Sequence, residues 1–304
     1  MIEDPSAQRV VELNNAILKS RGGIVSAQSM ILDFGCGSGR HTYEYLEAGF
    51  PNAFGYDVKN YVNLRSAADI AHFRFDPISA DGIDYPPMSK IPWPDNVFDF
   101  VFATSVFEHV REQKLAFSEI HRVLKLGGWF LNVFPSRWRP IEAHTDIPFG
   151  GVFNSPGYLK LCAALGIRGN LYEENFTADQ LVEANRYFLI HGVNYLSGPQ
   201  IADLLQQTFG EFEYAEDAFV DHSQRFVTGD VRLRCEPRRC TVVGRRSEVS
   251  LYDYGLATYE AADRFRHQDA EGFVRLWGQS VQTWAARQER RDEVVESPVD
   301  DPRR

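Results

Sequence analysis

Short, almost wholly apolar runs alternate along the chain with longer segments in which apolar residues recur at helical spacing. Runs of this length predict buried strands, and the periodic segments predict amphipathic helices. The expected strands are residues 29–34, 52–57, 72–75, 97–103 and 129–134, and the expected helices are residues 7–20, 40–48, 59–70 and 112–124. Strands that alternate with helices indicate right-handed βαβ units and a parallel sheet covered on both faces. We therefore expect a doubly wound α/β fold that binds its ligand at the carboxyl ends of the strands, near the switch in strand order.

The alternation lapses after residue 135. Ser155-Pro156 is typical of a helix start with serine at the N-cap and proline at the first helical position. The spacing of Thr177 and Gln180 is that of a capping box. These signals predict a helical insertion at about 136–198, which is long enough to cover a crevice.

Beyond the insertion the pattern returns to a helix followed by strands. A helix at 197–209 and two strands, 211–220 and 239–244, complete a mostly parallel seven-stranded sheet. We expect the last two strands to pair antiparallel. This organisation predicts one domain over residues 1–250 and a helical, charged C-terminal extension over residues 251–304.

The charge of the chain narrows the classes of partner. Its 304 residues include 32 Lys+Arg and 42 Asp+Glu, a formal net charge of −10. Proteins that bind nucleic-acid backbones need clustered basic residues, so no nucleic-acid partner is expected. No apolar run of about 18 residues is found, so we expect no membrane span. The composition leaves the oligomeric state open.

Cysteine usage and the first residues of the chain bear on its location. The four cysteines show no CxxC spacing, which disfavours a disulfide framework and a zinc site. The N-terminal residues lack the apolar core of a secretory signal. We therefore expect a reducing, cytoplasmic location and no metal site.

The strongest chemical signal is the segment from Asp33 to Gly39, D-F-G-C-G-S-G, between the first strand and the first helix of the alternating region. Glycines there allow a sharp turn and a close approach of the ligand to the backbone, and the amides at the start of the helix face that ligand. Asp57 lies 18 residues beyond Gly39 at the end of the second strand. A carboxylate at that place can accept hydrogen bonds from both hydroxyls of a ribose.

Position 40 separates two classes of cofactor. A dinucleotide-binding loop has the spacing G-x-G-x-x-G, which would need glycine where the chain has Arg40. The observed G-x-G-x-G preceded by Asp33 suits a cofactor that has no pyrophosphate but has an amino-acid end. This loop resembles motif I of the class I S-adenosylmethionine-dependent methyltransferases.

Three further blocks extend the resemblance. Residues 91–101 (IPWPDNVFDFV) are similar to the block around the fourth strand of that superfamily, and residues 106–110 (VFEHV) to the block after it. Residues 119–128 (EIHRVLKLGG) are similar to its next helix end, with Leu126 where proline is usual. The resemblance covers about residues 28–135 and implies a Rossmann-like methyltransferase fold with S-adenosylmethionine as cofactor.

The resemblance also implies a set of cofactor-binding residues. They are Asp33, Gly35, Cys36, Gly37, Gly39, Asp57, Asp76 or Asp84, Thr104 and Ser105. Asp33 would lie near the amino group of the methionine portion and Asp57 would hold the ribose. Asp76 is the first choice for the carboxylate on the adenine side, and Asp84 is its rival because residues 76–90 are longer than the usual spacing.

Residues on the acceptor side have two readings each. Residues 135–149 are similar to a segment of bacterial methyltransferases of cell-surface glycan or small-metabolite pathways. Glu142 and His144 can act together as a general base for a hydroxyl, or can tie the insertion to the sheet. His109 can be catalytic, or a packing histidine at a helix start.

We therefore expect metal-independent transfer of a methyl group from S-adenosylmethionine to a hydroxyl of a small-molecule or glycan-type acceptor. Two other classes stay open, an NAD-type oxidoreductase and a non-catalytic module that binds S-adenosylmethionine. A protein or RNA methyltransferase is disfavoured because Phe134-Pro135-Ser136-Arg137 stands where an Asn-Pro-Pro-aromatic signature would be.

Overall fold

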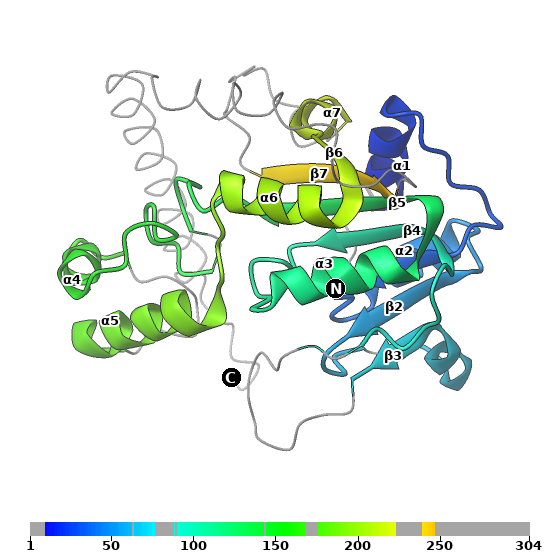
Figure 1. The fold of residues 1–304 in the computed structure, drawn as a ribbon. Coiled ribbons are helices and arrows are strands. Elements are labelled where there is room, and N and C mark those ends of the chain that lie inside the picture. Colours follow the sequence, from blue (N-terminus) through cyan, green and yellow to red (C-terminus); the bar gives the residue numbers. More distant parts are fainter. Residues whose placement is uncertain are drawn as a thin grey trace, which may run out of the picture. The chain divides into compact units, whose positions relative to one another are not determined.

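The apolar runs form neighbouring strands of one sheet (Figure 1). The parallel strands are β1 (Ile31–Phe34), β2 (Ala53–Asp57), β3 (Phe73–Phe75), β4 (Phe98–Thr104) and β5 (Leu124–Pro135). With β6 (Gly210–Tyr214) and β7 (Arg239–Arg246), the order across the sheet is β3-β2-β1-β4-β5-β7-β6. β7 pairs antiparallel with both β5 and β6. The expected seven-stranded, mostly parallel α/β sheet is confirmed.

The computed structural model describes residues 10–62, 64–76, 88, 90–142, 144–167, 176–222 and 239–246. These residues belong to two units, residues 10–137 with 183–246 and residues 138–182. The expected C-terminal extension, residues 251–304, lies outside them. No helix among the described residues is both long enough and apolar enough to cross a membrane.

Helices cover both faces of the sheet in the first unit. Helices α3 (Gln113–Val123) and α6 (Gly198–Phe209) lie side by side on one face (Figure 1), where Phe117, Ile120 and Leu205 pack on strand residues such as Val101 and Phe130. Helices α1 (Val10–Ser20), α2 (Arg40–Glu47) and α7 (Glu216–His222) contribute to a second core, on residues such as Ile31 and Phe102. Because both faces are covered, the strands read as continuous apolar runs.

The strand order reverses between β1 and β4. In a doubly wound sheet this is where ligands bind, outside the carboxyl ends of the strands. The loops that follow β1, β2, β4 and β5 therefore carry the candidate residues.

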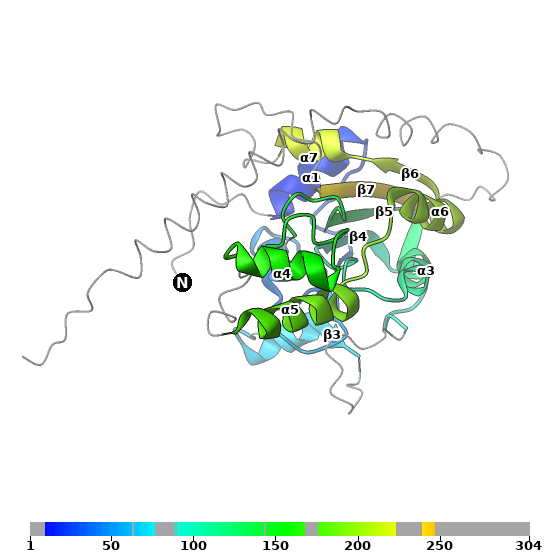
Figure 2. The same cartoon turned by 90° about the vertical axis from the view of Figure 1, so that its left-hand side faces the viewer.

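The second unit contains α4 (Pro156–Ala164) and the first turns of α5 (Ala178–Tyr187). Figure 2 shows α4 beside α5, and Lys160 of α4 forms a 3.1 Å ion pair with Asp179 of α5. Ser155 caps α4, and Thr177 with Gln180 caps α5, as expected. After α5 the chain continues through a π-helical turn, η3 (Phe188–Gly192). Both helices of the insertion are thus confirmed.

Three expected elements have different bounds in the structure. The expected helix 59–70 is wrong: among the described residues from 58 to 72, only those of η1 (Ala67–His72), a 3₁₀-helix, are helical. The side chain of Asn60 accepts a bond from the amide of Val62, and Ser66 and Asp69 cap η1 at its start. Such local side-chain to backbone bonds compete with an α-helix.

The other two differences are the start of β5 and the end of β6. Helix α3 ends at Val123, next to the expected residue 124, but β5 begins at Leu124 instead of residue 129. The register shift between Phe98 and Phe100 marks where β5 takes up the extra residues. Gly127, at φ 76°, belongs to that irregular start of β5 rather than to a helix cap. The expected strand 211–220 ends at Tyr214, because α7 follows and buries Ala218 against the second core.

Candidate functional site

The loop between β1 and α2 contains three glycines with positive φ, 75° at Gly35, 51° at Gly37 and 79° at Gly39. A Cβ at Gly35 would lie 2.5 Å from the methyl groups of Val106, and one at Gly39 would lie 2.9 Å from the ring of Phe73. No atom of the described residues lies within 4 Å of a Cβ position at Gly37. The first and third glycines therefore allow close packing, and the second leaves open space that a ligand can enter.

Asp57 ends β2 next to this loop. Its Oδ2 accepts a 2.8 Å bond from the amide of Gly37, and its Oδ1 accepts a 3.2 Å bond from the amide of Lys59. Burial raises the pKa of Asp57, and these amide bonds oppose the rise. Each carboxylate oxygen can accept a second hydrogen bond. Asp57 is thus held against the glycine of this loop that faces open space, and its oxygens can accept hydrogen bonds from ligand hydroxyls.

Asp33 lies one residue from the end of β1 and is almost fully buried on the face covered by α1 and α2. Its Oδ2 accepts a 2.9 Å bond from the hydroxyl of Thr42 in α2. Burial raises the pKa of Asp33 to about 7, the Thr42 bond opposes the rise, and the nearby Asp57 carboxylate adds to it. Asp33 therefore titrates near neutrality instead of staying ionised.

The side chain of Cys36 is buried at the turn of the glycine loop. Its Sγ lies 2.9 Å from the place a Cβ would take at Gly55 of β2. Burial, with the carboxylates of Asp33 and Asp57, raises the pKa of the thiol. Cys36 therefore packs against β2 as a neutral side chain, not as a nucleophile.

The structure describes one of the two candidates for the adenine-side carboxylate, Asp76. The amide of Asp76 donates a 3.1 Å bond to the carbonyl of Asp57, so Asp76 directly follows the end of β3 beside β2. Burial and the Asp76 carboxylate raise the pKa of Tyr56, which places Asp76 near that ring. Asp84 lies outside the described residues, so the choice between the two stays a prediction.

Thr104 and Ser105 lie at the end of β4, across the strand-order switch from β1. Ser105 has a φ of 57°, a left-handed conformation that is uncommon for a residue with a side chain. Its amide donates a 2.7 Å bond to the carbonyl of Val133 in β5. The chain then passes to Val106, which packs on Gly35. The strained turn thus joins the end of β4 to the glycine loop.

His109 lies in a turn, not at the start of a helix, since α3 begins at Gln113. Its Nδ1 is 2.8 Å from the carbonyl oxygen of Gly192 in η3. A carbonyl only accepts, so the neutral ring carries its proton on Nδ1 and its lone pair on Nε2. Nε2 is therefore the nitrogen that can accept a proton.

Asn194 fastens the same turn to the chain after η3. Its amide nitrogen Nδ2 donates to the carbonyls of Val110 (2.9 Å) and Arg111 (3.1 Å), and its backbone amide donates to the carbonyl of Glu108 at 2.5 Å. Gln113 adds a bond from Nε2 to the carbonyl of Asn194 at 3.1 Å. We call residues 107–113 with 191–194 the histidine strap. Sequence reasoning missed Asn194, which stands 85 residues after His109 and outside every recognised block.

Glu142 and His144 meet within the second unit. Glu142 is buried, its Oε1 lies 2.9 Å from Nδ1 of His144, and its Oε2 accepts bonds from the amides of His144 and Thr145 and from the Thr145 hydroxyl. An isolated bridge between Ile141 and Pro148 closes this turn. The carboxylate thus orients the imidazole with Nε2 as proton acceptor and also organises the loop. Whether the pair acts as a base or ties the insertion to the sheet stays a prediction.

Two family models match separate parts of the chain. Residues 32–132 match one described as a methyltransferase domain. Residues 209–284 match another, described as the Arginosuccinate synthase C-terminal domain. Strand β7 therefore completes the sheet from within the second matched stretch.

The curated relatives match over a short stretch. Argininosuccinate synthase of Picosynechococcus sp. is 43% identical over 91 residues, which are 27% of this chain and 23% of that protein. The enzyme of Synechococcus elongatus is 48% identical over 77 residues, 25% of this chain and 19% of that protein. The chain thus spans less than a quarter of the length of the curated relatives it matches.

Solved structures with similar folds include an S-adenosylmethionine-dependent methyltransferase from Mesorhizobium loti, at 16% identity and a TM-score of 0.43 over 77% of this chain and 100% of that chain. The YcgJ protein from Bacillus subtilis is 16% identical, with a TM-score of 0.42, over 78% of this chain and 99% of that chain. With TM-scores this low, the assignment rests on the family match, the strand order and the glycine loop. Residues 32–132 accordingly match a methyltransferase domain, and the strand order and the glycine loop agree with that match.

Proposed function

We propose that the chain transfers a methyl group from S-adenosylmethionine to a hydroxyl of a small-molecule or glycan-type acceptor, in the cytoplasm and without a metal. The observation that carries the cofactor part is the pairing of open space at Gly37 with the Asp57 carboxylate held beside it. Bound S-adenosylmethionine supplies a methyl group already activated on a sulfonium. The chain therefore needs mainly to orient donor and acceptor and to exclude water.

The cofactor residues take separate roles in this proposal. Asp57 receives the ribose hydroxyls, and Gly37 lets the ligand approach the backbone. Asp33, with its pKa near 7, ionises readily beside the positively charged amino group of the methionine portion, because an adjacent cation favours the carboxylate. Thr104 and Ser105 contribute backbone groups from the end of β4.

A hydroxyl acceptor must lose its proton as the methyl group is transferred. His144 is supported as the base by the buried Glu142 carboxylate on its Nδ1, which also stabilises the imidazolium that forms. His109 is supported by the Gly192 carbonyl on its Nδ1. The pH profiles of kcat for His144→Gln and His109→Gln separate them, because only loss of the true base removes the acidic limb of the profile.

We also propose that the methyltransferase domain extends over residues 1–250, with the insertion at about 136–198 and the extension from residue 251. The synthase-like match crosses this boundary. Since it represents less than a quarter of the synthases, we assign it no second activity.

Calorimetry with S-adenosylhomocysteine tests the cofactor part. We expect the intact chain to bind and Asp57→Ala to bind at least tenfold more weakly, because hydrogen bonds to a charged acceptor contribute about 1.5–3 kcal/mol each. Asp203→Ala, which removes an exposed carboxylate of α6, is the matched control. Absence of binding by the intact chain, or binding of reduced nicotinamide instead, overturns the proposal.

Turnover with a ¹³C-methyl donor tests the reaction. A panel of small hydroxyl compounds and glycans is offered, and the product methyl is identified by NMR as O-methyl, N-methyl or C-methyl. An N-methyl or C-methyl product contradicts the acceptor class but keeps the cofactor part. Binding without turnover on any acceptor class favours a non-catalytic module.

A further inference from the structure

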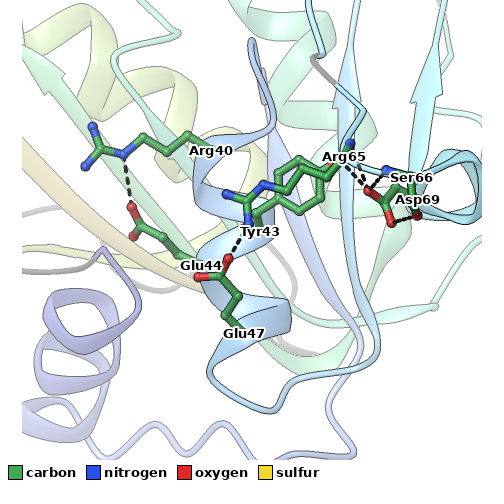
Figure 3. A network of polar contacts seen from close by, with 7 residues as sticks. All are labelled: Arg40, Tyr43, Glu44, Glu47, Arg65, Ser66 and Asp69. Carbon is green, nitrogen blue, oxygen red and sulfur yellow. Dashed lines mark hydrogen bonds and ion pairs between the residues drawn. The ribbon is translucent and has the colours of Figure 1, made fainter. Parts of the chain in front are cut away.

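A cluster of polar side chains joins α2 to the segment that follows Asp57 (Figure 3). Asp69 is its centre, with Oδ2 accepting bonds from the Tyr43 hydroxyl (3.0 Å) and the amides of Arg65 (3.1 Å) and Ser66 (2.8 Å), while Oδ1 accepts the Ser66 hydroxyl at 2.7 Å. The bond from the Ser66 hydroxyl is the main cause of a lowered pKa at Asp69. We call Tyr43, Arg65, Ser66 and Asp69 the Asp69 clamp.

Arg65 adds a second connection between the same two elements. Its guanidinium lies 4.2 Å from the centre of the Tyr43 ring and forms an ion pair with Glu47, also on α2 (Figure 3). The Tyr43 ring also packs against Phe73 of β3, with centroids 5.5 Å apart. Tyr43 thus bonds Asp69 through its hydroxyl, and its ring contacts both Arg65 and Phe73 of the sheet.

The clamp fixes a segment that has little apolar burial of its own. Between β2 and η1 the side chains of Tyr61 and Leu64 are exposed, and residues 58–62 and 64–66 form no helix. Its start reaches Asp57 through the amide of Lys59. Val62, in the middle, lies 3.2 Å from the place a Cβ would take at Gly39. The segment therefore lies against both the ribose carboxylate and the third glycine of the loop.

We propose that the Asp69 clamp is a positioning device for the nucleoside side of the cofactor site. It holds the segment after Asp57 on the glycine loop, so that Asp57 and the start of α2 keep one relative geometry before the ligand arrives. The inference rests on the proposed cofactor function. It adds Tyr43, Arg65 and Asp69 to the residues that set the affinity for the methyl donor. Tyr43 also joins the clamp to the glycine loop directly, because its amide donates a 3.0 Å bond to the carbonyl of Gly39.

Tyr43→Phe is the sharpest test, because it removes one hydroxyl and leaves the ring under Arg65 and against Phe73. We expect affinity for S-adenosylhomocysteine to fall on the order of tenfold, a usual effect of losing one hydrogen bond to a charged group. KM for the donor should rise by a similar factor with kcat within about twofold, because the chemistry lies elsewhere. Hydrogen exchange of amides 58–62 should quicken in the ligand-free chain.

Asp69→Asn provides a second variant with the same expected direction. In the double variant Tyr43→Phe/Asp69→Asn the losses should be less than additive, because both remove the same contact. Tyr214→Phe, which removes an exposed hydroxyl bonded to the carbonyl of Gly198, is the matched control and should bind as the unmodified chain does.

Two results overturn the inference in distinguishable ways. If the unmodified chain binds the ligand and both clamp variants bind equally well with unchanged exchange at 58–62, the clamp has no positioning role and the proposed function stands. If the unmodified chain does not bind, the proposed function fails, and the inference fails with it.

Discussion

Asp33 shows how a single buried carboxylate makes the stability of the domain depend on pH. Its usual pKa is ~3.9, and burial raises it to about 7 in the folded chain. Between these values the folded chain keeps a proton that the unfolded chain has lost. The contribution to stability is complete below pH ~4 and is lost as the pH rises through 7, with a slope of at most ~1.4 kcal/mol per pH unit.

Asp33→Asn should therefore remove this part of the pH dependence. Urea unfolding between pH 5 and pH 8 should give a flatter stability profile for Asp33→Asn than for the unmodified chain, and an unchanged profile for the exposed control Asp203→Asn. Parallel profiles for the unmodified chain and Asp33→Asn would show that Asp33 is ionised throughout this range.

At the same scale, sequence alone identified Asp33 and Asp57 by their places at strand ends but not the partners that tune them. Thr42 is a polar residue on the buried face of α2, and its bond to Asp33 depends on how that helix packs on β1. The meeting of Glu142 with His144 likewise depended on a backbone turn that spacing does not specify. Residue types and strand ends were therefore predictable, whereas protonation and orientation came from the packing.

Among elements, the histidine strap connects a turn after β4 with the chain after η3. Asn194 carries most of it, because its side chain bonds two carbonyls of the turn. We expect Asn194→Ala to lower the free energy of unfolding by about 1–3 kcal/mol, since it leaves those carbonyls without a protein donor. Asn52→Ala, which removes a single exposed bond to the carbonyl of Gln28, should cost less than ~0.5 kcal/mol.

Urea unfolding of both variants checks this, and the pH profile of kcat adds a functional readout. If His109 is the base, Asn194→Ala should also alter the acidic limb of that profile. Equal destabilisation by the two variants would contradict a special role for the strap.

The errors in element bounds have specific physical causes. Residues 59–70 carry a helical pattern of apolar positions, but the side chains of Asn60, Ser66 and Asp69 bond to nearby backbone and prevent an α-helix there. Gly127 has the position of a helix cap, yet β5 has already begun at Leu124. The periodicity of apolar residues predicts which side chains are buried, but it predicts the ends of helices and strands less well.

For the whole molecule, the alternation of elements predicted a doubly wound, mostly parallel sheet, but it did not predict that the last strands match another family. β7 pairs with β5 over seven residue pairs and lies inside the stretch that matches the synthase family. α7, from the same stretch, packs on α1, and Arg21 near the end of α1 forms ion pairs with Glu213 and Asp217. The methyltransferase sheet is thus completed by a segment whose sequence matches another family.

This arrangement predicts how truncations behave. A chain that ends at Phe209 keeps α6 but loses β6, α7 and β7, which leaves the long β5 as an unpaired edge and uncovers α1. We expect it to aggregate and to lose binding of S-adenosylhomocysteine, because exposed edge strands pair with other chains. A chain that ends at residue 250 keeps the whole sheet and should bind as the full chain does. Calorimetry and size-exclusion chromatography compare the full chain with the two truncated chains. Full binding by the shorter chain would show that the synthase-like strands are dispensable, and loss of binding by the longer one would place part of residues 251–304 within the domain.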